Sequence, residues 1–388
     1  MYNILKLNKI AAVGTDRLGE NYNCVDECDA PDGILVRSAS MHDMELPESL
    51  LAIARAGAGV NNIPLDKCTE KGICVFNTPG ANANAVKEMV VSGLMLASRD
   101  IIGSVEWVRS HADDPDIAKT VEKVKKNYAG TEVAGKTIGV IGLGAIGAQV
   151  ANTCRQLGMK VLGYDPYLSV NAAWSLDRHI HHVSKLSEIL EQADYITLHV
   201  PVIPQTKGMI GAAEIAAMKD GVIIINYARD LLVDEEALYA ALASGHVRRY
   251  VTDFANTTSV QMQNAIVTTH LGASTREAEE NCAVMAANEL MDYLENGNVN
   301  NSVNFGGVDL GRKGTGARIC VFNRNVPKMI GRITSTISEA GLNIENMANK
   351  ASGDVAYMLI ELSEPSFDSA LVDKLNAIDG IIRVRAIQ

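Results

Sequence analysis

The sequence has little positive charge and no long apolar run, and each shortage excludes a class of protein. Its 35 lysines and arginines are outnumbered by 46 acidic residues, which gives a net charge of −11. Nucleic-acid binding needs clustered lysine and arginine, and an acidic chain is not attracted to an anionic membrane surface. The apolar runs end well before the ~18 residues of a spanning helix, and residues 1–10 lack a secretory apolar core. We therefore expect a cytoplasmic protein with no nucleic-acid or membrane partner.

Cysteine pairs of the C-x-x-C type are absent, and the seven cysteines are scattered. An odd and dispersed set is typical of reduced thiols rather than of a disulfide framework. His179, His181 and His182 lie close together but have no acidic or cysteine partner at ligand spacing, so we predict loop residues and no metal. The 388 residues, 47% apolar and 21% charged, are typical of a folded chain of two or three domains.

Short runs rich in isoleucine and valine alternate with helical patterns over most of the chain. This alternation predicts crossover units and parallel sheets, and hence an α/β fold with two doubly wound domains. The predicted strands are residues 33–37, 51–54, 137–141, 160–164, 195–199, 222–226, 250–253 and 265–268. Two long helical patterns, 83–107 and 278–295, are apolar on nearly every side, so we expect them to bridge domains or to form a subunit interface.

The pattern changes after residues 309–316, a short segment rich in glycine and charge that is typical of a linker. The residues that follow predict strand 318–322, helix 330–340, strands 345–350 and 355–362, helix 366–378 and strand 381–387. This βαββαβ order is the ferredoxin-like arrangement. We therefore expect a linker at 308–316 and a separate domain at 317–388.

A glycine-rich turn at residues 142–147 follows the strand 137–141 and precedes a helical run. Gly142 permits a tight turn, Gly144 allows a pyrophosphate to approach the backbone, and Gly147 allows close packing of helix on strand. Asp165 ends the next strand, 18 residues beyond Gly147, where an acid binds the adenosine ribose and repels a 2′-phosphate. The sequence therefore predicts NAD binding; a methyltransferase-like glycine turn is the alternative.

Two other predicted strands end in residues suited to catalysis. Strand 222–226 leads to Arg229, and strand 265–268 leads to His270. Ligands of open α/β sheets bind beyond the carboxyl ends of the strands, so both side chains are expected beside the glycine turn. Arginine can bind a carboxylate through two hydrogen bonds, and histidine can exchange a proton near neutral pH. Together they suit oxidation of a 2-hydroxy acid, although each alone is more often a solvated surface residue.

These motifs, together with Leu198-His199-Val200-Pro201 and the loop that begins Arg55-Ala56-Gly57, resemble the D-isomer-specific 2-hydroxyacid dehydrogenase family. The resemblance implies Arg229 and His270 as catalytic residues, and Arg37, Arg55, Ala58 and Gly59 as substrate-binding residues. Besides the glycines and Asp165, it implies cofactor contacts from Ala145, Ile146, His199, Val200, Pro201, Thr206, Tyr227, Ala228, Asp253, Gly272 and Ala273. It also implies a substrate-binding domain of residues 1–93 and 277–307, an NAD-binding domain of residues 94–276, and a homodimer or homotetramer.

One catalytic group of the family is missing. Its members have a glutamate a few residues after the stretch matching Asp253, and that glutamate favours the protonated histidine. Thr257 or Thr258 stands there in this sequence, and the next acid is Glu277. A hydroxyl brings no negative charge, so we expect a slower enzyme, a differently tuned one, or one that recruits Glu277.

The C-terminal residues resemble the small serine-binding regulatory (ACT) domain found in bacterial members of the family. Asn323, Asn325 and Asn343 match its effector-binding positions, and Lys328 replaces a glycine there. The resemblance implies an L-serine effector, with a purely dimerising role as the alternative.

The variant of the His270 motif is typical of the branch that oxidises 3-phosphoglycerate to 3-phosphohydroxypyruvate, the first step of serine biosynthesis. That reaction is our leading prediction for this chain. Two alternatives stay open. One is another D-2-hydroxyacid dehydrogenase or 2-ketoacid reductase, and the other is a catalytically weak NAD(H)-binding regulatory protein.

Overall fold

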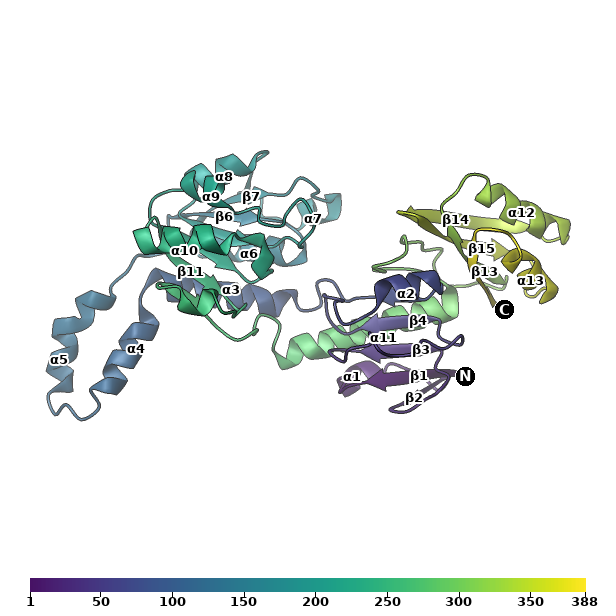
Figure 1. Ribbon diagram of the computed structural model, residues 1–388, viewed down its shortest axis with the longest axis horizontal. Helices are drawn as coiled ribbons and strands as arrows, with labels where there is room; N and C mark the ends of the chain where they lie inside the picture. Colours follow the sequence, from purple (N-terminus) through teal and green to yellow (C-terminus); the bar gives the residue numbers. More distant parts are fainter. The chain divides into compact units, whose positions relative to one another are not determined.

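The computed structural model describes residues 1–388, apart from the side chain of residue 171. The chain forms two compact units, one of Met1–Asn82 with Arg276–Gln388 and the other of Ala83–Thr275 (Figure 1). The sequence predicts boundaries after residues 93 and 276, whereas these units divide the chain after residues 82 and 275. The residues predicted as a separate C-terminal domain belong to the first unit.

The first unit contains a parallel sheet of five strands in the order β2-β1-β3-β4-β5. Its central strands are short and apolar because both of their faces are buried, by α11 on one side and by α2 with its neighbouring loops on the other. The elements are β1 (Tyr2–Leu7), α1 (Ala12–Thr15), β2 (Tyr22–Val25), β3 (Gly33–Val36), β4 (Ala52–Arg55), α2 (Leu65–Glu70), β5 (Cys74–Phe76) and α11 (Arg276–Asn296).

The C-terminal part of the first unit is an antiparallel sheet of four strands in the order β14-β15-β13-β16, with two helices. Its elements follow in the predicted sequence, and the sheet is compatible with the ferredoxin-like arrangement. They are β13 (Arg318–Arg324), α12 (Met329–Glu339), β14 (Ile344–Ser352), β15 (Val355–Leu362), α13 (Ala370–Asn376) and β16 (Ile381–Ile387).

The two sheets of the first unit share one core. The rings of Phe76 and Tyr293 lie 5.7 Å apart, and those of Phe322 and Tyr357 lie 4.7 Å apart, within a single apolar cluster. The fully buried Arg318 donates to the carbonyl oxygens of Asn296 and Gly311, both at 2.8 Å. The segment predicted as a linker is therefore held in place by the sheet that follows it.

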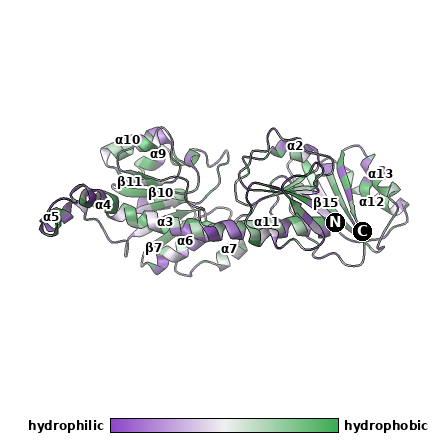
Figure 2. Ribbon diagram, turned by 90° about the horizontal axis from the view of Figure 1, so that it is seen from below, coloured by the Kyte–Doolittle hydropathy of each residue, from purple (hydrophilic) through white to green (hydrophobic). Residues whose placement is uncertain are grey.

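The second unit contains a parallel sheet in the order β12-β11-β10-β9-β6-β7-β8. Helices α3 and α6 cover one face, and α8, α9 and α10 cover the other; β10 and β11 are mainly hydrophobic in Figure 2. The strands are β6 (Thr137–Ile141), β7 (Lys160–Tyr164), β8 (His181–His182), β9 (Tyr195–Leu198), β10 (Val222–Asn226), β11 (Val247–Thr252) and β12 (Ala265–Val267). The helices that join them are α6 (Ala145–Gln156), α7 (Val170–Trp174), α8 (Leu186–Gln192), α9 (Ala212–Ala216) and α10 (Glu235–Ser244), with 3₁₀ turns η2 (Asp230–Leu232) and η3 (Ser259–Gln261).

The predicted helix 83–107 is wrong as a single element. The structure has α3 (Ala83–Ser98) and then α4 (Ile101–Ser110), because the Asp100 carboxylate accepts the Gly103 N–H at 3.2 Å and begins a new helix. Helix α5 (Ile117–Val124) and the 3₁₀ turn η1 (Lys125–Tyr128) return towards the sheet, and neither α4 nor α5 has a buried residue (Figure 1). Among the described residues, no helix combines the length and the apolar character needed to cross a membrane.

Candidate active site

The glycine turn joins β6 to α6 and has the geometry expected of a pyrophosphate-binding loop. Gly142 has φ = +90°, and a Cβ atom at Gly147 would lie 1.9 Å from the Gly142 carbonyl oxygen. A Cβ at Gly144 would meet nothing within 4 Å, so the space above this residue is open to a ligand. Ala145 and Ile146 begin α6, whose unpaired N–H groups point towards the same space.

Asp165 follows β7 and is bound to the glycine turn through its own carboxylate. Its Oδ2 accepts the Leu143 N–H at 2.9 Å, and its Oδ1 accepts the Tyr167 N–H at 2.8 Å. The acid therefore lies beside the loop at the carboxyl end of the neighbouring strand, as the NAD prediction requires.

The segment after β9 packs under the glycine turn. A Cβ built on Gly142 would lie 2.5 Å from the His199 carbonyl oxygen and 2.8 Å from the Val200 side chain. Burial lowers the pKa of the His199 imidazole to about 3, so the ring is neutral, and its Nε2 lies 2.9 Å from Thr197 Oγ1. Thr206 Oγ1 accepts the Ile203 N–H and donates to the Pro201 carbonyl, which holds the segment in a tight turn.

Arg229 lies three residues beyond β10 in a turn that Asn226 braces. The buried Asn226 Oδ1 accepts the N–H groups of Ala228 and Arg229, and its Nδ2 donates to the Arg229 carbonyl at 2.8 Å. The exposed Arg229 guanidinium donates to the Ala228 carbonyl at 2.6 Å. Its other N–H groups leave it able to bind a carboxylate. The Tyr227 side chain is buried in the core, so only its backbone can serve the predicted cofactor contact.

His270 follows β12 and is exposed at the same edge of the sheet. The Phe254 ring packs against its imidazole with 4.9 Å between ring centroids. Parallel strands lie about 4.8 Å apart, so the ends of β10 and β12 are about 10 Å from each other across β11. The loops that carry Arg229 and His270 therefore leave the same edge of the sheet, two strands apart.

Asp253 connects this edge of the sheet to the His270 loop. Its side chain is buried, and its Oδ2 accepts the Gly272 N–H at 2.8 Å. Its Oδ1 is also buried but has no hydrogen-bond partner among the described residues. A buried carboxylate oxygen without a partner costs free energy unless a ligand N–H reaches it. This atom fits the carboxamide of a nicotinamide, and Ala273 follows in the same loop.

The loop that lacks the family's glutamate is η3 and the residues before it. Thr257 is exposed and Thr258 half-buried, and in the part of the chain that the structure describes no hydrogen bond joins either of them to His270. Glu235 reaches the loop from α10, where its Oε1 accepts from Asn256 Nδ2 at 2.6 Å. Asn226, Phe254 and Glu235 support the site without being in the predicted set. Only Asn226, a polar residue closing an apolar strand, has a sequence signal of its own.

The substrate-binding residues predicted in the first unit gather at the ends of β3 and β4. Arg55 Nε donates to the Arg37 carbonyl at 3.0 Å, and Arg37 Nη2 lies 2.6 Å from Glu279 Oε1 of α11. The loop after β4 contains Ala58 and Gly59, and the Ala58 carbonyl accepts from Asn77 Nδ2 at 2.6 Å. The two predicted cations are therefore neighbours, and Arg37 has an anionic partner in Glu279.

The three asparagines predicted to bind an effector are not brought together within the chain. Asn325 Nδ2 donates to the Gly353 carbonyl, beyond one end of β13, whereas Asn343 Nδ2 donates to Ser363 Oγ, beyond the other end. Those ends are about 20 Å apart. Asn323 is buried and donates to the Arg324 carbonyl at 2.7 Å.

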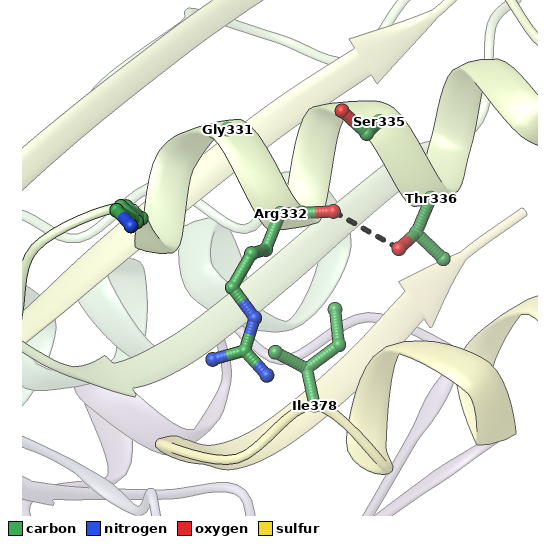
Figure 3. A pocket seen from close by; sticks show the side chains of 6 residues that line it. Gly331, Arg332, Ser335, Thr336 and Ile378 are labelled. Carbon is green, nitrogen blue, oxygen red and sulfur yellow. Dashed lines mark hydrogen bonds between the residues drawn. The ribbon is translucent and has the colours of Figure 1, made fainter.

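Lys328, expected at the effector site, instead lines an open groove of about 530 Å³ beside α12. Figure 3 shows the Arg332 side chain reaching down from α12 to Ile378 in this groove, and Arg332 Nη1 donates to the Asp379 carbonyl at 2.9 Å. None of the three asparagines lines the groove. Elsewhere, the described residues contain no cluster of three or more histidine, cysteine or acidic side chains that could hold a metal.

Sequence comparisons agree with this geometry. Residues 91–272 match the model of the D-isomer specific 2-hydroxyacid dehydrogenase NAD-binding domain. The D-3-phosphoglycerate dehydrogenase of Escherichia coli (strain K12) is 33% identical over 355 residues, which cover 88% of this chain and 82% of that protein. The chain belongs to the D-isomer specific 2-hydroxyacid dehydrogenase family. This membership supports NAD as its cofactor and a dehydrogenase as its class of enzyme.

Other relatives extend the likeness. A D-3-phosphoglycerate dehydrogenase of Methanocaldococcus jannaschii is 33% identical over 353 residues, covering 89% of this chain but 64% of that protein. The chain spans about half the length of several further relatives with the same name. The crystal structure of an NAD⁺-bound 3-phosphoglycerate dehydrogenase of Entamoeba histolytica matches with a TM-score of 0.60 at 27% identity, covering 78% of this chain and 98% of that one.

Proposed function

We propose that this family member is an NAD-dependent dehydrogenase that oxidises 3-phosphoglycerate to 3-phosphohydroxypyruvate, the first step of serine biosynthesis. The observation that supports this most is the placement of the glycine turn, Arg229 and His270 at one edge of the seven-stranded sheet. The names of the relatives favour 3-phosphoglycerate over other 2-hydroxy acids as the substrate.

Each side chain has a defined task in this reaction. Arg229 binds the substrate carboxylate through its guanidinium and fixes the orientation of the 2-hydroxyl group. A neutral His270 accepts the hydroxyl proton while the C2 hydrogen leaves as a hydride. Bound NAD⁺ supplies the hydride acceptor. Arg37 and Arg55 are assigned to the substrate phosphate, with Ala58 and Gly59 in the loop beside them.

The missing glutamate predicts slow turnover. A carboxylate in contact with an imidazolium is worth about 1–3 kcal/mol, and each 1.36 kcal/mol lost from the transition state costs about tenfold in rate. The presence of Thr257 and Thr258 in the loop where the family has its glutamate supports this expectation. The hypothesis that Glu277 takes over the role stays a prediction.

We further propose that the C-terminal sheet and its helices form an ACT-like regulatory domain, and that the protein is a cytoplasmic homodimer or homotetramer. An L-serine effector bound by Asn323, Asn325 and Asn343 would require asparagines from different chains, because one chain holds Asn325 and Asn343 at opposite ends of the sheet. The element order and sheet order of residues 318–387 support the domain assignment.

The test is a steady-state assay of the full chain in both directions, with 3-phosphoglycerate and with 3-phosphohydroxypyruvate. We expect His270→Ala to lower kcat by about 10²–10⁴-fold while NADH still binds. His179→Ala, which alters an exposed histidine paired with Asp177, is the matched control. Unchanged turnover in His270→Ala removes this residue from the mechanism.

One observation favours a second function, that of a catalytically weak NAD(H)-binding regulatory protein. The loop after Asp253 has Thr257 and Thr258 where the family has its glutamate. Tight NADH binding without turnover on any hydroxy acid would select this function. Activity that survives removal of both Arg37 and Arg55 would instead select an unphosphorylated 2-hydroxy or 2-keto acid as the substrate.

A further inference from the structure

Arg37, which is assigned to the substrate phosphate, forms an ion pair with an acidic residue of α11. Arg37 Nη2, at the end of β3, lies 2.6 Å from Glu279 Oε1 in the first turn of α11. The two side chains keep 40% and 42% of their surface exposed, so water and solutes reach the pair. Exposed ion pairs contribute little to stability, which makes this one easy to exchange for another anion.

The pair lies within a small cationic cluster. Arg55 Nε donates to the Arg37 carbonyl, and the Arg55 guanidinium lies over Gly57, where a Cβ atom would be 2.5 Å from Nη1. The Cys282 thiol lies one turn beyond Glu279. Burial raises the pKa of this thiol, a hydrogen bond with Thr78 and the charges of Arg55 and Arg37 oppose the rise, and Glu279 adds to it.

We propose that Glu279 is an internal competitor for Arg37, which a doubly charged phosphate displaces and a singly charged anion does not. This inference rests on the proposed function in one respect, because it takes the substrate phosphate as the group that binds the two arginines. With Glu279 in place, its carboxylate neutralises the charge of Arg37. When Glu279 swings away, the Arg37 guanidinium can bind a phosphate through two hydrogen bonds.

Because a ligand must displace Glu279 from Arg37, its affinity should depend on its charge. A singly charged anion only replaces one carboxylate contact of Arg37 by another and gains nothing, whereas a phosphate dianion is attracted to Arg37 by twice the charge. The pair therefore selects phosphorylated hydroxy acids against unphosphorylated ones and keeps Arg37 oriented while the site is empty. A neutral side chain at position 279 would remove that selection.

The decisive measurement is the binding of inorganic phosphate to the full chain at pH 8, by isothermal titration calorimetry. A carboxylate about 6 Å from a phosphate dianion opposes its binding about tenfold even in a water-like dielectric. We therefore expect Glu279→Gln to lower the Kd for phosphate about tenfold and to bind acetate more tightly than the parent does. Glu280→Gln is the matched control, because Glu280 is the next residue on α11 and pairs with Arg276 at 2.7 Å.

Two outcomes would overturn the inference: an unchanged Kd in Glu279→Gln, or an equal change in Glu280→Gln. If Glu279→Gln does not fold, Glu279→Asp, which shortens the same carboxylate, should lower the Kd about twofold, and an unchanged Kd there also overturns it.

Turnover distinguishes this inference from the proposed function. If the parent oxidises 3-phosphoglycerate, Glu279→Gln should lower its KM with little change in kcat. If no variant turns over 3-phosphoglycerate, the proposed function fails, but the phosphate titration still tests Glu279.

Discussion

Replacing Glu289 by glutamine should change how the stability of the protein depends on pH. Glu289 lies on α11 and is 8% exposed. Its Oε1 accepts from Asn301 Nδ2 at 2.6 Å, while its Oε2 is buried and has no partner among the described residues. Burial raises the pKa of this carboxyl from 4.5 to about 7. The folded chain therefore holds this proton at pH values where the unfolded chain has lost it.

The sign and size of the effect follow from that shift. Below pH 4.5 the Glu289 carboxyl is protonated in both the folded and the unfolded state, so its ionisation does not lower the stability of the fold. As the pH rises from 4.5 to about 7 the unfolded state ionises first, so the free energy of unfolding falls, and above pH 7 the loss is constant. At 1.36 kcal/mol for each pKa unit, the total loss is about 3 kcal/mol.

Urea unfolding of the parent and of Glu289→Gln at several pH values from 4.5 to 8 measures this loss. Other carboxyls titrate in both proteins, so the informative quantity is the difference in free energy of unfolding between them. Between pH 4.5 and pH 8, we expect the free energy of unfolding of Glu289→Gln to rise by about 3 kcal/mol relative to that of the parent. Glu277→Gln, an exposed carboxyl on the same helix, should show no such trend. A parent–variant difference that does not change with pH would refute the reasoning.

Further predictions concern the cofactor loop and the C-terminal sheet. Gly144→Ala should keep the melting temperature but weaken NADH binding, because its Cβ enters the open space expected to hold the cofactor. Gly147→Ala should lower both the melting temperature and the affinity for NADH, since its Cβ would lie 1.9 Å from the Gly142 carbonyl oxygen. Thermal melts and fluorescence titration with NADH separate the two variants, and equal effects would be contrary to the loop assignment. Asp253→Asn should destabilise the chain by about 1–3 kcal/mol and weaken NADH binding, because an amide cannot accept the Gly272 N–H and a nicotinamide N–H equally well; unchanged binding would remove this carboxylate from the cofactor site. Arg318→Met should cost about 3–5 kcal/mol and expose residues 309–316 to proteolysis, and an unaltered cleavage pattern would count against the anchoring role of this arginine.

Much of the sheet structure could be predicted because the strands are short, apolar and buried on both faces. β6, β7 and β10 have the predicted bounds. The glycine turn could also be predicted from the sequence, because the positive φ at Gly142 and the close backbone contact at Gly147 exclude other residues. Motifs of this kind depend on steric contacts between residues close in the chain, so the sequence alone is enough to predict them.

Tertiary contacts are what the sequence did not reveal. The break between α3 and α4 depends on Asp100 capping a new helix inside an apolar pattern that continues across it. The packing of the C-terminal sheet depends on Arg318. An arginine in a sequence is usually expected to be exposed, but this one is fully buried and donates to the carbonyls of Asn296 and Gly311. Glu279 likewise lies 242 residues from Arg37 in the chain, and no local pattern predicts their contact.

The most direct test of the proposed reaction is the transfer of deuterium from C2-deuterated 3-phosphoglycerate to NAD⁺, followed by mass spectrometry of the reduced cofactor. The account predicts that the parent forms deuterated cofactor and that His270→Ala forms it at least about 100-fold more slowly while still binding NADH. Absence of transfer in the parent, or an equal rate in His270→Ala, would contradict the assignment of the glycine turn, Arg229 and His270 to one dehydrogenase site.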